Sequence, residues 1–401
     1  MKYLILVGDG MGDLPMAELD GRTPLETART PAMDHLAENG ELFLLRTIPE
    51  GYPPGSDVAN LSLVGYLPQE CYTGRAPLEA ASMGVELGGD RIAFRCNLVT
   101  IDQQADGGVT MVDYSSGHIT SGEARQLIEA LDRELGDEGN RFHAGVSYRH
   151  LLVHSGEVAG LVTVPPHDHT GREVTEYWQR YQAIPGLAAL MNRAPAILAQ
   201  HPVNLDRVKR GLNPANGIWL WGEGKAPIMP TLQEKYGVSG ALISAVDLLK
   251  GIGVYAGMEI INVEGATGYL DTNYQGKVEA ALAALVDKDL VFVHVEAPDE
   301  AGHQGLLREK IQAIEDFDQR IVQPILDGLE GRDFRLAVAM DHFTPLAIRT
   351  HSNQMVPVSI YDSRRNGKAS GLPYTEAAGA RCGRELANGR VFLETLLNVS
   401  R

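Results

Sequence analysis

The sequence has few cysteines and no long hydrophobic run. Cys71, Cys96 and Cys382 are far apart and without C-x-x-C spacing, so we expect neither a disulfide framework nor a cysteine-rich zinc site, and a reducing compartment. No stretch approaches the roughly 20 apolar residues that a membrane helix needs. The apolar run at residues 3–7 is too short for a signal peptide. We therefore expect a cytoplasmic protein that does not bind membranes.

Positive charge is also scarce. Lysine and arginine number 35 against 52 acidic residues, which gives a net charge of -17 and argues against a nucleic-acid-binding surface. An anionic substrate is not excluded, because a site can be locally basic or hold metal ions on an acidic protein. The P-loop, the G-x-S-x-G elbow, H-E-x-x-H and a G-x-G-x-x-G after a strand are all missing. These absences exclude several common nucleotide-binding and hydrolase sites.

Short apolar runs alternate with helical patterns towards both ends of the chain. The pattern predicts strands at 3–8, 241–245, 259–263, 290–295 and 334–340, and helices from Pro31, at 275–286 and at 305–328. Continuous apolar strands that alternate with helices predict an α/β fold, a mainly parallel sheet sandwiched by helices. The middle of the chain is more polar. We therefore expect a discontinuous core from residues 1–91 and 230–401, with an inserted α+β domain at 92–229.

Residues of metal-ligand type follow three of the predicted strands. The carboxyl ends of parallel strands meet at one edge of a sheet, where ligands bind. Aspartate and imidazole suit Zn, Mn or Fe, and the set is large enough for two divalent cations. Residues one helical turn apart, such as Asp299 and His303, share a helix face. The candidate ligands are Asp9, Asp299, His303, Asp341, His342 and His351.

Ser56 lies in Pro53-Pro-Gly-Ser, where a helix is expected to start. A hydroxyl at a helix N-terminus faces free backbone N–H groups, which also bind phosphate. A metal bound to its oxygen would make it a nucleophile. A plain helix N-cap is the simpler interpretation of the local sequence, and both interpretations stay open at this stage.

Several basic residues are candidates for binding an anion. Arginine is favoured for bidentate contacts with phosphate or carboxylate, although each residue alone is also compatible with solvated surface. The segment His167-Asp168-His169 could be an acid/base pair, a substrate contact or a plain loop. Lys250 ends an apolar segment beside glycines, and the other candidates are Arg75, Arg149 and Lys225.

Long strings of the sequence resemble the alkaline-phosphatase superfamily, and within it the archaeal-type cofactor-independent (2,3-bisphosphoglycerate-independent) phosphoglycerate mutases. The resemblance covers nearly the whole chain. The strings are Val7-Gly-Asp-Gly-Met-Gly-Asp, Pro54-Gly-Ser-Asp-Val-Ala-Asn-Leu-Ser-Leu, Gly265-Ala-Thr-Gly-Tyr-Leu-Asp-Thr-Asn-Tyr, Glu296-Ala-Pro-Asp-Glu-Ala-Gly-His, and Asp341-His with His351 downstream.

The resemblance implies an alkaline-phosphatase-like core with an inserted domain, and phosphoryl transfer through a phosphoserine. It implies two divalent ions, Mn or Zn, with Mg, Co or Fe as further options, and no 2,3-bisphosphoglycerate. One ion would bind Asp299, His303 and His351. The other would bind Asp9, Ser56, Asp341 and His342, with Ser56 as the nucleophile and Lys250 at the phosphoryl group.

Two segments of the inserted domain depart from the archaeal mutase pattern. Pro165-Pro-His-Asp-His-Thr-Gly stands where that group tends to carry an Asp-Thr-Asp-Pro-His-like string, and Ser116-Gly-His118 where it tends to carry Ala-Gly-Arg. We expect His118 and residues 167–169 to contact the non-phosphate part of the substrate. A related branch with the Pro-Pro-His-Asp variant has been proposed to be homoserine kinases.

The leading hypothesis is therefore interconversion of 3-phosphoglycerate and 2-phosphoglycerate, with a small phosphorylated metabolite as the only partner. The alternatives are a homoserine kinase that makes O-phosphohomoserine, a related metal-dependent phosphatase, and a metal-binding or scaffold protein with an inactive site. The sequence does not indicate the oligomeric state.

Overall fold

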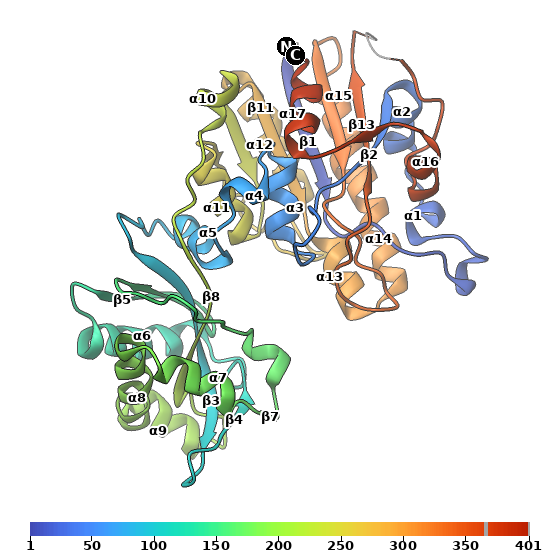
Figure 1. Ribbon diagram of the computed structural model, residues 1–401. Coiled ribbons are helices and arrows are strands. Elements are labelled where there is room, and N and C mark those ends of the chain that lie inside the picture. The colour runs from blue at the N-terminus through green and yellow to red at the C-terminus, as the bar shows by residue number, and fades with distance from the viewer. Residues whose placement is uncertain (365–367, 400–401) are drawn as a thin grey trace. The chain divides into compact units, whose positions relative to one another are not determined.

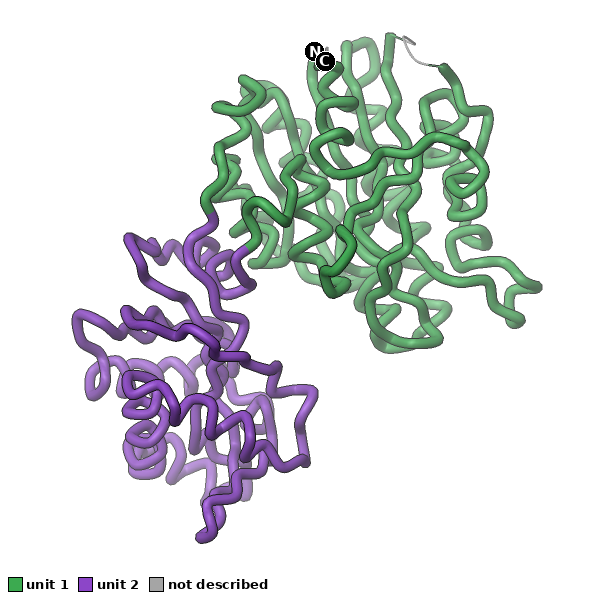
Figure 2. The backbone as a smooth tube through the Cα atoms, viewed as in Figure 1, with its two compact units in different colours: residues 1–72, 228–401 green, residues 73–227 purple. Residues whose placement is uncertain are grey.

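A computed structural model of the chain describes residues 1–364 and 368–399. The chain forms two compact units, which Figure 2 colours separately: unit 1 is residues 1–72 with 228–401, and unit 2 is residues 73–227. The expected boundary at residue 91 is wrong, because helix α5 (Arg75–Ser82) packs within unit 2 on strands β3 (Ile92–Gln103) and β8 (Gly217–Lys225). Ala76 and Ala80 of that helix contact Ala93 and Leu151 there.

Unit 1 is built on an eight-stranded sheet with the order β10-β9-β11-β1-β12-β13-β2-β14. Figure 1 labels β1, β2, β11 and β13 of this sheet. Every neighbouring pair is parallel except the two made by β13, which runs antiparallel to β12 and β2. The expected mainly parallel α/β sheet is thus confirmed. The strands are β1 Lys2–Gly8, β2 Glu41–Leu45, β9 Gly240–Ile243, β10 Glu259–Ile260, β11 Leu290–Val295, β12 Phe334–Ala339, β13 Val356–Asp362 and β14 Glu385–Leu386.

Every residue of β11 and β12 is buried, on both faces of the sheet. This burial indicates that helices cover both faces. The expected helix at 305–328 is interrupted by a π-helical turn, η3 (Asp318–Val322). The turn lies just before Pro324, which has no backbone N–H to donate to the preceding helical turn. The helical segments are η1 Ala17–Leu19, α1 Pro24–Thr27, α2 Pro31–Asn39, α3 Ser56–Leu63, α4 Pro68–Cys71, α10 Leu232–Tyr236, α11 Asp247–Tyr255, α12 Tyr274–Asp287, α13 Ala297–Gln304, α14 Leu307–Phe317, η3 Asp318–Val322, α15 Gln323–Gly328, α16 Glu376–Arg381 and α17 Gly389–Leu397.

Unit 2 is α+β, with an antiparallel sheet in the order β5-β6-β3-β4-β7 and β8 also paired with β3. Alternate residues of β3, such as Phe94, Cys96 and Leu98, enter an apolar core together with residues of α6 and α8. The strands are β3 Ile92–Gln103, β4 Val109–Asp113, β5 Asn140–Val146, β6 Arg149–His154, β7 Arg172–Glu173 and β8 Gly217–Lys225. The other helical segments are α6 Ser121–Leu135, η2 Pro166–His169, α7 Thr175–Gln182, α8 Pro185–Gln200 and α9 Pro202–Lys209.

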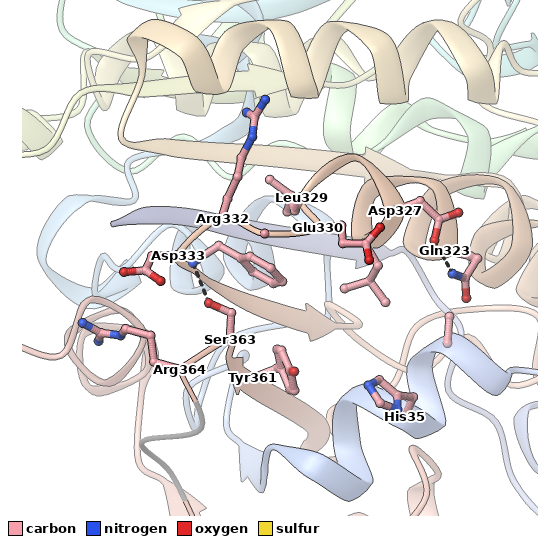
Figure 3. Close-up of a pocket in the computed structure, with 14 residues that line it drawn as sticks. His35, Gln323, Asp327, Leu329, Glu330, Arg332, Asp333, Tyr361, Ser363 and Arg364 are labelled. Atoms are coloured by element: carbon pink, nitrogen blue, oxygen red, sulfur yellow. Dashed lines mark hydrogen bonds between the residues drawn. The ribbon is translucent and has the colours of Figure 1, made fainter.

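A polar cavity lies where β12 begins and β13 ends, at the sheet edge opposite the carboxyl end of β12 (Figure 3). Its side chains hydrogen-bond to near neighbours: Gln323 donates to Asp327 at 2.7 Å, and Ser363 accepts from the N–H of Phe334 at 2.9 Å. The predicted metal ligands do not line this cavity.

Within the described residues, no helix has the length and apolar character to cross a bilayer.

Candidate active site

The predicted metal ligands converge at the carboxyl ends of β1, β11 and β12. These strands are parallel neighbours, and each leads into a loop or helix that carries acidic and histidine side chains. The N–H of Asp9, just after β1, donates to the carbonyl of Val295 at 2.9 Å, which holds the Asp9 loop against the end of β11. Asp9, Asp299, Asp341 and His342 are all at most 5% exposed. Burial of charge on this scale requires a compensating partner.

Asp299, His303 and His351 form one compact group. Asp299 and His303 are one turn apart on α13, and His303 Nε2 lies 3.2 Å from the Asp299 carboxylate. His351 Nε2 lies 2.9 Å from His303 Nε2 and 3.5 Å from Asp299. His303 Nδ1 lies 3.0 Å from the carbonyl of Arg349, an outer contact that commonly fixes the tautomer of a metal-binding histidine. The donor set fits a divalent cation.

His342 joins a second group with Asp9, Asp341 and Ser56. Its Nε2 lies 3.5 Å from Asp9 Oδ1, 3.3 Å from Asp341 Oδ2 and 3.0 Å from Ser56 Oγ. Ser56 is the first residue of α3, and Gly55 is the N-cap. The N-cap interpretation of Ser56 is therefore wrong, and the hydroxyl is directed at the imidazole instead.

Asn60, one turn along α3, connects this helix to the same cluster. Its side-chain amide donates to Asp341 Oδ2 at 2.9 Å and to the carbonyl of Ser56 at 2.9 Å. Asp341 Oδ1 accepts the N–H groups of Gly10 at 3.1 Å and His342 at 2.8 Å. The position of Asp341 is thus fixed from three elements.

The electrostatics of the cluster also favour bound cations. Burial raises the pKa of Asp9 well above its ordinary value, and the nearby Asp341 and Asp299 carboxylates raise it further. Burial alone would raise the pKa of Asp299, but hydrogen bonds with His303 and His351 outweigh it and hold that pKa well below its ordinary value. Asp9 Oδ1 is buried and has no hydrogen-bond partner among the residues that the structure describes. A cation at these oxygens would relieve both the repulsion and the unsatisfied atom.

Two lysines of unit 1 are candidates for contacting a phosphate. The predicted residue, Lys250, lies on α11, where its Nζ is 3.3 Å from Asp247 of the same helix. Lys277 on α12, which the sequence did not single out, is fully buried and donates from Nζ to the carbonyl of His294 at 2.9 Å. Burial lowers the pKa of Lys277 to about 8. Lys277, Ala281 and Leu285 are four residues apart and lie on the buried face of α12. This spacing in the sequence could have indicated that the lysine occupies a core position.

Aromatic and cationic side chains gather on one face of the unit 2 sheet. Arg95 of β3 lies opposite Trp221 of β8, with its guanidinium carbon 3.9 Å from the centre of the indole ring. Arg95 Nε donates to Glu79 at 2.9 Å, and burial lowers the pKa of this arginine to about 10. Arg149 of β6 pairs with Asn97, two residues along β3, and so lies on the same face. Neither Arg95 nor Trp221 was expected as a site residue.

Three further predicted residues belong to this group. Arg75 Nε lies 3.4 Å from the Glu79 carboxylate that also binds Arg95. The His167 ring is centred 5.6 Å from the Trp221 ring. The rings of His118 and His167 both pack on Tyr114, at 6.2 and 6.0 Å. The Tyr148 ring lies 5.3 Å from the Tyr114 ring, and the guanidinium carbon of Arg149 lies 5.7 Å from the Tyr148 ring centre. We refer to one set of residues as the Arg95 cluster: Arg75, Arg95, Arg149, His118, His167, Tyr114, Tyr148 and Trp221.

His118 is held in a left-handed turn. Ser116, Gly117 and His118 have φ values of 51°, 66° and 49°, which costs about 1–3 kcal/mol for each non-glycine residue. The Asp113 carboxylate accepts the N–H of Gly117 at 2.6 Å, and Arg207 donates to the carbonyl of Ser116 at 2.5 Å. Such strain is typical of functional loops, where surrounding contacts maintain it.

The remaining predicted residues have other neighbours. Asp168 is 62% exposed and lies 3.6 Å from His167. The His169 ring packs on Tyr177 at 4.8 Å. Lys225 is exposed, and its Nζ lies 3.2 Å from Asp90. Their described contacts thus do not place His169 or Lys225 in the Arg95 cluster.

Comparison with known proteins identifies the family of the chain. A family profile of 2,3-bisphosphoglycerate-independent phosphoglycerate mutase matches residues 37–204. A protein of that name from Methanosarcina acetivorans is 56% identical over 365 residues, 90% of each chain. One from Geobacter sulfurreducens, named as a probable member, is 51% identical over 399 residues, 99% of this chain and 100% of its own.

Solved structures agree as well. A protein from Pyrococcus horikoshii shares 30% identity with a TM-score of 0.84, and the match covers 100% of this chain and 98% of the other. A cofactor-independent phosphoglycerate mutase from Thermoplasma acidophilum shares 26% identity with a TM-score of 0.68 over 100% of both chains. The chain therefore belongs to the family of 2,3-bisphosphoglycerate-independent phosphoglycerate mutases.

Proposed function

We propose that the protein interconverts 3-phosphoglycerate and 2-phosphoglycerate through a phosphoserine at Ser56, without 2,3-bisphosphoglycerate. The observation that carries this proposal is the Ser56 hydroxyl, 3.0 Å from His342 in a cluster of buried aspartates and histidines. A hydroxyl in that setting is placed to act as a nucleophile. The high identity to relatives that are named as such mutases supports the choice of substrate.

Two divalent ions fit the cluster. Asp299, His303 and His351 would hold one ion, and Asp9, Ser56, Asp341 and His342 the other. Mn or Zn suits these ligands, and Mg, Co and Fe are further options. When bound, such ions lower the pKa of a coordinated hydroxyl and neutralise charge that develops on phosphate oxygens. Lys250 or Lys277 would supply a further positive charge for the phosphoryl group.

The chain's own residues would then carry the transfer in two steps. Ser56 Oγ would lose its proton and attack phosphorus, the bond from phosphorus to one glycerate oxygen would break, and that oxygen would take up a proton in place of the one lost from Ser56. The glycerate would stay bound and re-orient. Its other hydroxyl would then lose its proton and attack the phosphorus of phosphoserine, the Oγ–P bond would break, and Ser56 Oγ would take up a proton again. Exclusion of water would protect the phosphoserine from hydrolysis.

The Arg95 cluster is the proposed site for the non-phosphate part of the substrate. Arginines and imidazoles provide the donors that a carboxylate requires. Arg95 is fixed by Glu79 and Trp221, so it is pre-organised. Arg149 and His118 are exposed and accessible to a ligand. Asp168, His169 and Lys225 remain predicted substrate-binding residues whose roles are tested by substitution.

A second candidate function is homoserine phosphorylation. It is favoured by His118 and His167, which lie in the two segments that depart from the archaeal mutase pattern, and which both pack on Tyr114. Phosphorus NMR distinguishes the two functions. Protein loaded with Mn is incubated with 3-phosphoglycerate or, separately, with homoserine and ATP. We expect 2-phosphoglycerate, and phosphohomoserine without 2-phosphoglycerate would overturn the proposal.

A further inference from the structure

A histidine outside the expected ligand set faces the same aspartates. His294 lies in β11, where it is paired in register with Val7 of β1, so its side chain shares a sheet face with that of Asp9 two residues later. It is fully buried. Its Nε2 lies 3.0 Å from Asp9 Oδ2, yet neither His294 Nε2 nor Asp9 Oδ1 has a hydrogen-bond partner among the described residues. A buried imidazole nitrogen and a buried carboxylate oxygen of neighbouring side chains are thus both left without a hydrogen-bond partner in the described part of the chain.

Such atoms are uncommon in native proteins and require an explanation. Three donor residues, Asp9, His294 and Asp341, offer ligand atoms that all lie within 4.8 Å of one another, and all three are buried. That arrangement leaves a site for a cation between them. A cation there would satisfy both unpartnered atoms at once.

The far side of the His294 ring is already supported. Its Nδ1 lies 3.3 Å from Ser244 Oγ at the end of β9, and Ser244 Oγ also accepts the N–H of Val246 at 3.0 Å. A hydroxyl oxygen can accept two hydrogen bonds, so Ser244 Oγ can also accept a hydrogen bond from an Nδ1–H of His294. That tautomer leaves the lone pair of Nε2 directed at Asp9. Metal-binding histidines are commonly oriented by such an outer partner.

We propose that His294 Nε2 is a direct ligand of the cation held by Asp9 and Asp341, with Ser244 fixing its tautomer. The inference rests on the proposed two-ion centre and adds a fourth imidazole to His303, His342 and His351. The competing account gives His294 an Nε2–H that donates to Asp9, which would make it a positioning residue with no bond to the ion.

Paramagnetic NMR separates the two accounts. The full-length protein is labelled with nitrogen-15 histidine and loaded with cobalt(II), and the strongly shifted signals of coordinated imidazoles are counted. We expect four such imidazoles in the wild type and three in His294→Gln. Three in the wild type, or an unchanged number in His294→Gln, would overturn the proposal.

Two further samples keep the test interpretable. His35→Gln removes an exposed histidine on α2 and should leave all four signals. His294→Asn provides a second variant if the glutamine protein does not fold, and the wild-type count alone already decides the question. If the wild type binds no cobalt, the proposed metal centre itself fails. If it binds cobalt through only three imidazoles, the centre stands and the role of His294 is wrong.

Discussion

Lys310 connects two of the loops that carry the proposed metal ligands. It lies on α14 with no exposed surface, and its Nζ donates to the carbonyls of Gly12 at 3.1 Å and Thr344 at 2.8 Å and to the Asp13 carboxylate at 2.8 Å. Gly12 and Asp13 follow β1, and Thr344 follows β12. Replacing the lysine by methionine keeps much of the side-chain volume and removes all three hydrogen bonds.

The size of the effect follows from what is left behind. Asp13 is 1% exposed, so Lys310→Met leaves a buried carboxylate without its counter-ion. Removing one partner of a buried ion pair costs about 3–5 kcal/mol. For a unit of this size that lowers the thermal midpoint by between about 6 and 20 °C. The double variant Lys310→Met with Asp13→Asn should recover part of the lost stability, because it no longer contains a buried carboxylate without a counter-ion.

The assay must report on unit 1. All three tryptophans, Trp178, Trp219 and Trp221, lie in unit 2, so tryptophan fluorescence follows unit 2 as an internal control. Hydrogen exchange of the β1 and β12 amides follows unit 1. Lys288→Met, which breaks a partly exposed pair with Glu259, should cost at most about 1 kcal/mol. Equal effects of Lys310→Met and Lys288→Met would refute the reasoning.

Three further predictions concern catalysis, metal and pH. Removal of divalent ions by a chelator should abolish mutase activity and lower the thermal unfolding midpoint of unit 1, and added Mn or Zn should restore both. At a metal concentration of 100 Kd, binding should stabilise the folded state by about 2.7 kcal/mol. An unfolding midpoint that does not change with metal would contradict this prediction. Arg95→Met should raise KM for 3-phosphoglycerate at least about tenfold, from the loss of a charged hydrogen bond. Lys209→Met, at an exposed residue of α9, serves as the surface comparison, and equal KM values for the two variants would argue against the Arg95 cluster. Burial raises the pKa of Glu376 to about 7, so the folded state binds more protons than the unfolded state between about pH 4.5 and 7, and the stability of the folded state should fall as pH rises through that window. Calorimetry should therefore show Glu376→Gln gaining stability relative to wild type from pH 5 to pH 8. A difference in stability between the two proteins that stays constant with pH would contradict the raised pKa.

The sequence was sufficient to predict five strands of the eight-stranded sheet, β1, β9, β10, β11 and β12, and to identify the candidate ligands that follow three of them. Residues after β1, β11 and β12 meet because parallel strands carry their carboxyl ends to one sheet edge. The spacing of Asp299 and His303 alone places both on one helix face. The boundary at residue 72 was missed because the residues that α5 packs against, such as Leu151, lie far along the chain.

The residues that the proposals add to the sequence-predicted set share one property. His294, Lys277 and Arg95 all stand in apolar segments, whose pattern indicates a core position and conceals a polar role. Their partners come from distant segments: Ser244 for His294, and Trp221 for Arg95. Only tertiary structure brings such partners together.

The most direct test of the account is the state of Ser56 during turnover. Metal-loaded wild type is mixed with phosphorus-32-labelled 3-phosphoglycerate, quenched in acid within one turnover, and digested for mass spectrometry. The account predicts a phosphoserine at Ser56 that forms at least as fast as 2-phosphoglycerate, and neither label nor turnover in Ser56→Ala. Turnover without phosphorus-32 on Ser56, or mutase activity in Ser56→Ala, would contradict the account.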